Sequence, residues 1–177
     1  MNFPSAAADS SHAAPPSAPP VNFVRAMLAL GVGGFAIGTG EFASMGLMPN
    51  MVASLGVTEP QVGHLISAYA LGVVIGAPLP AILGAGWQRK TLLLSLMGFY
   101  ALGNLASALG PTYHDLLLFR FIAGLPHGAY FGVAALTAVA ISPPDRRGRA
   151  VSLVMLGLTL AILIGNPLAT WAGQVID

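Results

Sequence analysis

The chain has 177 residues, of which 55% are hydrophobic and only 7% are charged, and it contains no cysteine. A soluble globular domain carries about 25% charged residues, so this composition excludes an ordinary soluble domain. The lack of cysteine excludes a disulfide scaffold, and a net charge of +1 argues against nucleic-acid binding. The composition therefore predicts an integral membrane protein.

The N-terminal segment differs from the rest of the chain. Residues 1–20 are mostly Ala, Pro and Ser and show no apolar periodicity. Such a segment buries too little surface to offset the entropy cost of ordering it. It also lacks the basic region and apolar stretch of a secretory signal. We therefore predict a disordered cytoplasmic tail over residues 1–23.

Residues 24–177 divide into apolar runs that are each close to the length of a membrane span, about 20 residues. Short segments with Gly, Pro or helix-capping residues separate them. The runs are too long for the strands of a membrane β-barrel, which alternate over about 10 residues. The sequence predicts an all-α polytopic membrane protein with about five transmembrane helices, over residues 24–48, 62–83, 91–109, 116–141 and 151–172.

Basic residues mark one side of this five-helix topology. The loops between helices 1 and 2 and between helices 3 and 4 contain no Lys or Arg. Six of the seven basic residues fall on the opposite side: Arg25, Arg89, Lys90, Arg146, Arg147 and Arg149. The positive-inside rule makes that side cytoplasmic, so we expect the N-terminus in the cytoplasm.

Two charged residues lie well inside predicted helices, Glu41 in the first and Arg120 in the fourth. Helix 1 runs outward and helix 4 runs inward, so at 1.5 Å per residue both residues lie roughly 6–10 Å from the outer side. Charged groups inside a membrane usually pair with each other or line an aqueous pathway. We interpret both as proton-coupling candidates. The structural alternative is a buried salt bridge that holds helices 1 and 4 together.

His127 follows Arg120 on the same helix by about two turns. It is either a third proton-coupling candidate or a neutral imidazole that hydrogen-bonds to a neighbouring helix. No His or acidic residues show the spacing of metal ligands, so we expect no metal site and no cofactor. Glycines at four-residue spacing, such as Gly72 with Gly76 and Gly124 with Gly128, favour close helix packing.

Three of the predicted helices contain short motifs that are informative in combination. The first helix contains GTGEF over residues 38–42 and MGLMP over residues 45–49. The fourth contains Arg120 followed by Gly124 and Gly128, and the fifth opens with RGRA and contains GNPL over residues 165–168. Jointly they resemble the major facilitator superfamily in its drug:proton antiporter branch, including arabinose-efflux-like and chloramphenicol-resistance-type permeases.

The resemblance implies a secondary active transporter with twelve helices in two six-helix halves, of which this chain is the N-terminal part. It implies proton-coupled efflux of a small amphipathic compound or a sugar across the bacterial inner membrane, and no enzyme activity. Its partners would be the lipid bilayer, the substrate and protons. Glu41 would carry the proton beside the counter-charge of Arg120. We add three cavity-lining candidates: Met45, Tyr130 and Asn166.

The basic loops differ in one respect from those of the family. The loop before Arg89 and Lys90 lacks the Asp that the family usually carries there. A motif of that type occurs instead between helices 4 and 5, where it comprises Asp145, Arg146, Arg147, Gly148 and Arg149. We interpret these residues and Arg89 and Lys90 as a cytoplasmic loop motif.

The chain ends at Asp177, after about five predicted helices. By the resemblance, helix 6 and the second half would lie outside it. We expect a fragment of a transporter, one part of a split transporter that joins a separate C-terminal half, or a truncated membrane module without transport activity of its own. An intramembrane enzyme would need a nucleophile with a base or a metal, and serines such as Ser67 and Ser95 have no evident partner.

Overall fold

The computed structural model describes residues 22–79, 82, 84 and 86–176, and these form helices joined by short turns. The elements are α1 (Phe23–Gly46), α2 (Met48–Leu55), α3 (Glu59–Gly76), α5 (Arg89–Leu109), α6 (Tyr113–Ala140), the 3₁₀ turn η1 (Pro144–Arg146), α7 (Arg147–Leu160), the π turn η2 (Ala161–Gly165) and α8 (Asn166–Ile176). The predicted tail falls almost wholly on residues 1–21, which lie outside the described residues.

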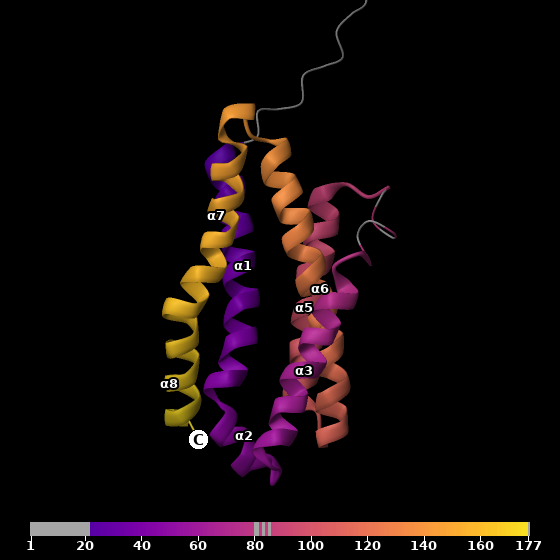
Figure 1. The fold of residues 1–177 in the computed structure, drawn as a ribbon, viewed down its shortest axis with the longest axis vertical. Coiled ribbons are helices and arrows are strands. Elements are labelled where there is room, and N and C mark those ends of the chain that lie inside the picture. Colours follow the sequence, from indigo (N-terminus) through magenta and orange to yellow (C-terminus); the bar gives the residue numbers. More distant parts are fainter. Residues whose placement is uncertain (1–21, 80–81, 83, 85, 177) are drawn as a thin grey trace, which may run out of the picture.

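The long helices pack as two groups, which can be followed in Figure 1. In one group α3 and α5 pack along α6, and in the other α7, η2 and α8 pack along α1. The groups meet where α6 contacts α7 and α1. Buried side chains from both groups form one apolar core, which includes Leu30, Ile37, Tyr69, Tyr100 and Tyr130. The helices that carry Glu41 and Arg120 therefore meet at the junction of the two groups.

Glycines allow α3 and α6 to approach closely. Gly72 lies against the backbone carbonyl of Phe121, and Gly124 lies against the backbone carbonyl of Tyr69. A Cβ atom at either glycine would overlap the facing backbone. The four-residue glycine spacing seen in the sequence therefore corresponds to a backbone-to-backbone contact, as is common between membrane helices.

Capping side chains set where helices begin. The Asn22 side chain accepts a hydrogen bond from the backbone N–H of Arg25 at 3.3 Å, so α1 begins at Phe23 rather than at residue 24. The Thr112 hydroxyl accepts from the backbone N–H of Asp115 at 3.3 Å, and α6 begins at residue 113, ahead of the predicted 116. Both caps satisfy N–H groups that the first turn of a helix leaves free.

The segment between the first two predicted spans is helical. α1 ends at Gly46, and after Leu47 the chain enters α2, which has Pro49 in its first turn. A proline is compatible with that position because no intrahelical N–H bond is needed there. α2 ends at Gly56, whose φ of 63° is in the left-handed region that glycine adopts without steric cost. A capping box at Thr58 then begins α3.

The last predicted helix is divided into α7, η2 and α8. Pro167 has no backbone N–H and therefore cannot continue the α-helical ladder to residue 163. The N–H of Asn166 bonds instead to the carbonyl of Ala161, five residues back. Figure 1 shows the helix bending at this π turn, between α7 and α8.

By length and composition alone, four helical segments in the described residues could cross a membrane: Phe23–Gly46, Arg89–Leu109, Tyr113–Ala140 and Pro144–Ile176. α3 is not among them, since its first turn contains the polar residues Glu59 and Gln61. The second predicted span reached residue 83, but residues 80, 81 and 83 lie outside the described residues. The chain is an all-α polytopic membrane protein, which confirms the predicted fold class.

Candidate functional site

Glu41 and His127 face each other across the contact of α1 and α6. The Oε2 atom of Glu41 lies 3.8 Å from Nδ1 of His127, and the two side chains are 25% and 10% exposed. The sequence singled out both residues as proton-coupling candidates but did not pair them. Their proximity places a carboxyl group beside an imidazole between the two groups of helices.

Tyr69 on α3 connects to the same imidazole. Its hydroxyl lies 3.0 Å from Nδ1 of His127, and the two rings meet edge to face with centroids 5.7 Å apart. Tyr69 is 2% exposed. A buried tyrosine hydroxyl requires a hydrogen-bond partner, and His127 provides it.

Arg120 lies on the other side of Tyr69. Its guanidinium carbon is 4.7 Å from the centroid of the Tyr69 ring, a cation–π arrangement. Arg120 is buried, and its Nε has no hydrogen-bond partner in the described part of the chain. Arg120 and Glu41 interact electrostatically. Among the described residues, however, the carboxyl group of Glu41 makes its close contact with the imidazole of His127 and not with the guanidinium of Arg120.

Tyr100 on α5 completes the cluster. Its hydroxyl donates to the backbone carbonyl of Ile37 on α1 at 3.0 Å, and it interacts with the Tyr69 side chain. Gly40 on α1 lies against the same hydroxyl, where a Cβ would overlap it. We call the set Glu41, Tyr69, Tyr100, Arg120 and His127 the polar network. Four helices contribute to it.

The polar network is suited to hold and release a proton. A carboxyl group and an imidazole can both bind and lose protons, whereas a guanidinium keeps its charge. No cluster of three or more His, Asp or Glu side chains in the described residues could hold a metal ion. The chemistry available at this site is therefore protonation and electrostatic attraction.

Comparison with known proteins shows the family of the chain. The model of the Major Facilitator Superfamily matches residues 30–177. The chain belongs to the Major Facilitator Superfamily. This membership confirms the resemblance that the motifs of the first, fourth and fifth predicted helices indicated.

Relatives of the chain within the superfamily include named transporters. It is 44% identical over 150 residues to the inner membrane transport protein YdhP of Escherichia coli strain K12, which covers 85% of this chain and 39% of the relative. It is 37% identical over 142 residues to the chloramphenicol resistance protein of Streptomyces lividans, covering 78% and 36%. It is 32% identical over 143 residues to a "Probable sugar efflux transporter" of Helicobacter pylori strain ATCC 700392 / 26695, covering 81% and 37%.

The chain thus spans about two fifths of the length of these curated relatives, over their N-terminal portion. No solved structure matches it. Membership of the superfamily makes it a multi-pass membrane protein from a family of transporters.

The three cavity-lining candidates lie on three different helices. Met45 is 46% exposed near the end of α1. The Tyr130 hydroxyl donates to the carbonyl of Leu30 at 2.9 Å and fills the contact between α6 and α1. Asn166 accepts a hydrogen bond from Thr170 at 3.3 Å on α8, and its Oδ1 also lies toward Gly46, the neighbour of Met45.

The residues of the predicted loop motif gather at one end of the protein. The Arg89 guanidinium donates to the carbonyl of Leu136 at 3.3 Å, which brings the start of α5 to the last turns of α6. Asp145 and Arg146 form an exposed ion pair with Oδ2 and Nε 3.4 Å apart. The remaining motif residues are exposed: Lys90, Arg147, Gly148 and Arg149. α1 and α7 also begin at this end (Figure 1).

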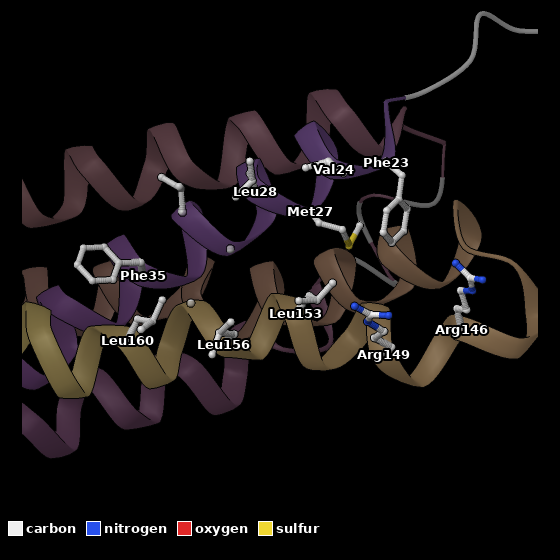
Figure 2. A pocket seen from close by; sticks show the side chains of 13 residues that line it. Phe23, Val24, Met27, Leu28, Phe35, Arg146, Arg149, Leu153, Leu156 and Leu160 are labelled. Atoms are coloured by element: carbon white, nitrogen blue, oxygen red, sulfur yellow. The ribbon is translucent and has the colours of Figure 1, made fainter.

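A groove of about 500 Å³ runs between α1 and α7. Figure 2 shows Arg146 and Arg149 at one end of it and Phe35 and Leu160 toward the other, with apolar side chains between them. Glu41 and His127 are not among its lining residues. We therefore place the candidate functional site at the polar network, because the groove offers no titratable group other than its arginines.

Tyr69 and Tyr100 were missed by the sequence analysis. The available signal was a tyrosine inside an apolar span, because its hydroxyl must find a partner among the neighbouring helices. The sequence did not show which partner, since that depends on how each helix is rotated about its axis.

Proposed function

We propose that this chain forms part of a proton-coupled efflux transporter in which Glu41 carries the proton. The observation that supports this is the position of its carboxyl group, 3.8 Å from His127 and within the electrostatic field of the buried Arg120. An ionisable residue held between membrane helices marks a transport pathway by default. The transporter moves its substrate without changing it covalently.

The arrangement explains how protonation can act on conformation. An ionised Glu41 is attracted to Arg120 and can accept a hydrogen bond from His127, so it stabilises the contact between α1 and α6. A protonated Glu41 loses the attraction to Arg120. Because α1 and α6 belong to different helix groups, proton binding changes the relative stability of two packings of those groups.

The names of two relatives support a class of substrate. One is named for chloramphenicol resistance and another for sugar efflux. We infer a small amphipathic compound or a sugar as cargo, moved out of the cell across the bacterial inner membrane. The basic end of the protein would face the cytoplasm together with the N-terminus. A C-terminal half, as in the longer relatives, would close the opposite wall of the cavity.

The test is a transport assay on the transporter that carries this chain. Everted membrane vesicles would be incubated with chloramphenicol or with each of a panel of sugars, and uptake into the vesicle lumen would be measured with and without a proton gradient. Glu41→Gln, which mimics a permanently protonated carboxyl group, should abolish the gradient-driven component and leave membrane insertion intact.

Glu59→Gln is the matched control, because Glu59 is an exposed acid in the first turn of α3. Its transport should equal that of the unmodified protein. Gradient-driven transport by Glu41→Gln at the unmodified rate would overturn the proposal.

A further inference from the structure

A single nitrogen of His127 has two neighbours. Its Nδ1 lies 3.0 Å from the Tyr69 hydroxyl and 3.8 Å from Oε2 of Glu41. A ring nitrogen of histidine either carries a hydrogen, and then donates, or presents a lone pair, and then accepts. Nδ1 can therefore accept from Tyr69, or it can carry a hydrogen that faces the Tyr69 oxygen and the Glu41 carboxylate, but it cannot accept and donate at once.

We propose that Tyr69 is a positioning residue for proton coupling, whose hydroxyl and the Glu41 carboxylate compete for Nδ1 of His127. This inference rests on the proposed role of Glu41 as the proton carrier. It adds α3 to the helices that respond to protonation and assigns a function to a residue outside the predicted site.

The two states follow from hydrogen-bond chemistry. When Glu41 is ionised it accepts only, so the state with the hydrogen on Nδ1 is favoured, because that N–H is attracted to the carboxylate oxygen 3.8 Å away and Nδ1 then accepts nothing from Tyr69. When Glu41 takes up a proton from water, the carboxylate is gone and the Tyr69 hydroxyl donates to the lone pair of Nδ1. The imidazole hydrogen then resides on the other ring nitrogen.

The surroundings restrict what else can move. The Tyr69 backbone lies against Gly124, and its ring lies against the Arg120 guanidinium, so both are held in place. The hydroxyl hydrogen remains free to rotate. His127 is approached by Glu41 from α1 and by Tyr69 from α3, while Phe131 packs on its ring with centroids 5.2 Å apart.

Two further charged or titratable groups contact Tyr69 rather than His127. Arg120 lies beneath the Tyr69 ring, and Tyr100 on α5 interacts with Tyr69. Neither forms a hydrogen bond with His127 in the part of the chain that the structure describes, so the competition at Nδ1 is between Tyr69 and Glu41.

The first test uses the unmodified transporter, purified with ¹⁵N-labelled histidine and without substrate. Its pH is varied while the Glu41 carboxyl band is followed by infrared spectroscopy, with Glu41→Gln identifying that band. The ¹⁵N signal of His127 Nδ1 should change from donor to acceptor as Glu41 becomes protonated. In Glu41→Gln it should remain an acceptor over the whole pH range in which the imidazole is neutral. A signal that does not follow the titration of Glu41 would overturn the proposal.

The second test is Tyr69→Phe, which removes the hydroxyl and keeps the ring on Arg120. The protonated state of Glu41 loses one supporting hydrogen bond, so the midpoint of the carboxyl titration should move to lower pH by about 0.5–1 unit. An unchanged or higher midpoint would contradict the inference.

Tyr113→Phe is the matched control. The Tyr113 hydroxyl also joins α6 to α3, through the carbonyl of Gln61 at 3.1 Å, and it also approaches a histidine, His64, at 3.4 Å. Among the described residues it makes no hydrogen bond with Glu41, and its removal should leave the midpoint unchanged. Because the titration needs no substrate, a failure here is distinguishable from a failure of Glu41→Gln to lose transport, which concerns the proposed function.

Discussion

The guanidinium of Arg120 lies over the ring of Tyr69, with its central carbon 4.7 Å from the ring centroid. A charged side chain on α6 is thereby stacked on an aromatic side chain of α3, inside a bundle of apolar helices. The same tyrosine contacts His127 through its hydroxyl. One aromatic residue therefore links the fixed cation to the titratable groups of the polar network.

Arg120→Lys tests this stacking because lysine keeps the charge and loses the planar group. We expect the free energy of unfolding in detergent to fall by about 0.5–2 kcal/mol, the range of a cation–π contact. Thermal melting of the purified protein would measure it. Arg25→Lys is the control, since Arg25 is exposed at the start of α1. Equal melting of Arg120→Lys and the unmodified protein would show that the stacking contributes no stability.

His127→Phe tests the shared imidazole. Phenylalanine keeps a ring against Tyr69 but removes both nitrogens, so the buried Tyr69 hydroxyl loses its hydrogen bond to the imidazole, at a cost of about 1 kcal/mol. Glu41 loses its neighbour at the same time. We expect gradient-driven transport to fall by about 10-fold or more in vesicles, since 1.4 kcal/mol corresponds to a factor of ten.

His114→Phe is the control for that variant, because His114 is exposed on the same helix. Its transport should match that of the unmodified protein. If His127→Phe also transports at that rate, the imidazole has no part in coupling.

The depth of the charged groups in the membrane could be predicted from the sequence, but their contacts could not. The rise per residue of a helix is fixed, so Glu41 and Arg120 could be assigned similar depths from their positions alone. The rotation of each helix about its own axis could not be predicted, because it depends on contacts between segments that are distant in sequence. One such contact is that of Gly40 with the Tyr100 hydroxyl. For this reason the sequence predicted Arg120 as the partner of Glu41, whereas the carboxyl group of Glu41 lies 3.8 Å from His127.

The interruption of the last predicted helix at η2 could not be predicted in detail from the sequence either. A proline inside a helix, such as Pro167, does not by itself show whether the helix bends, ends or passes through a π turn. Here the chain passes through η2, where Gly165 lies against the Thr39 side chain of α1. Tertiary packing of this kind leaves no local pattern in the sequence.

Membrane orientation can be tested because the chain contains no cysteine. Ser54 is exposed in α2, and Gln88 is exposed immediately before α5. Figure 1 shows α2 at the end of the bundle opposite to the end where α1 and α7 begin, and Arg89 belongs to the loop motif at that second end. In intact cells a membrane-impermeant thiol reagent should label Ser54→Cys and should label Gln88→Cys only after permeabilisation, as the positive-inside rule requires. The reverse pattern would place the basic end outside the cell.

Gly124→Ala tests the close contact of α3 and α6. The added methyl group would overlap the backbone carbonyl of Tyr69, so the two helices must separate. We expect a loss of about 1–3 kcal/mol of stability, as for other overpacked interiors. Because Tyr69 carries both the stacking on Arg120 and the bond to His127, transport should fall along with stability. Detergent melting and vesicle transport would be measured on the same preparations.

Gly132→Ala is the matched control on the same helix, because a Cβ at Gly132 meets no atom within 4 Å. Alanine also favours the helical state over glycine by up to about 1 kcal/mol. This variant should melt at or above the temperature of the unmodified protein and transport normally. If Gly124→Ala behaves in the same way, the α3–α6 contact is not what fixes Tyr69, and the close approach of the two backbones has no bearing on the polar network.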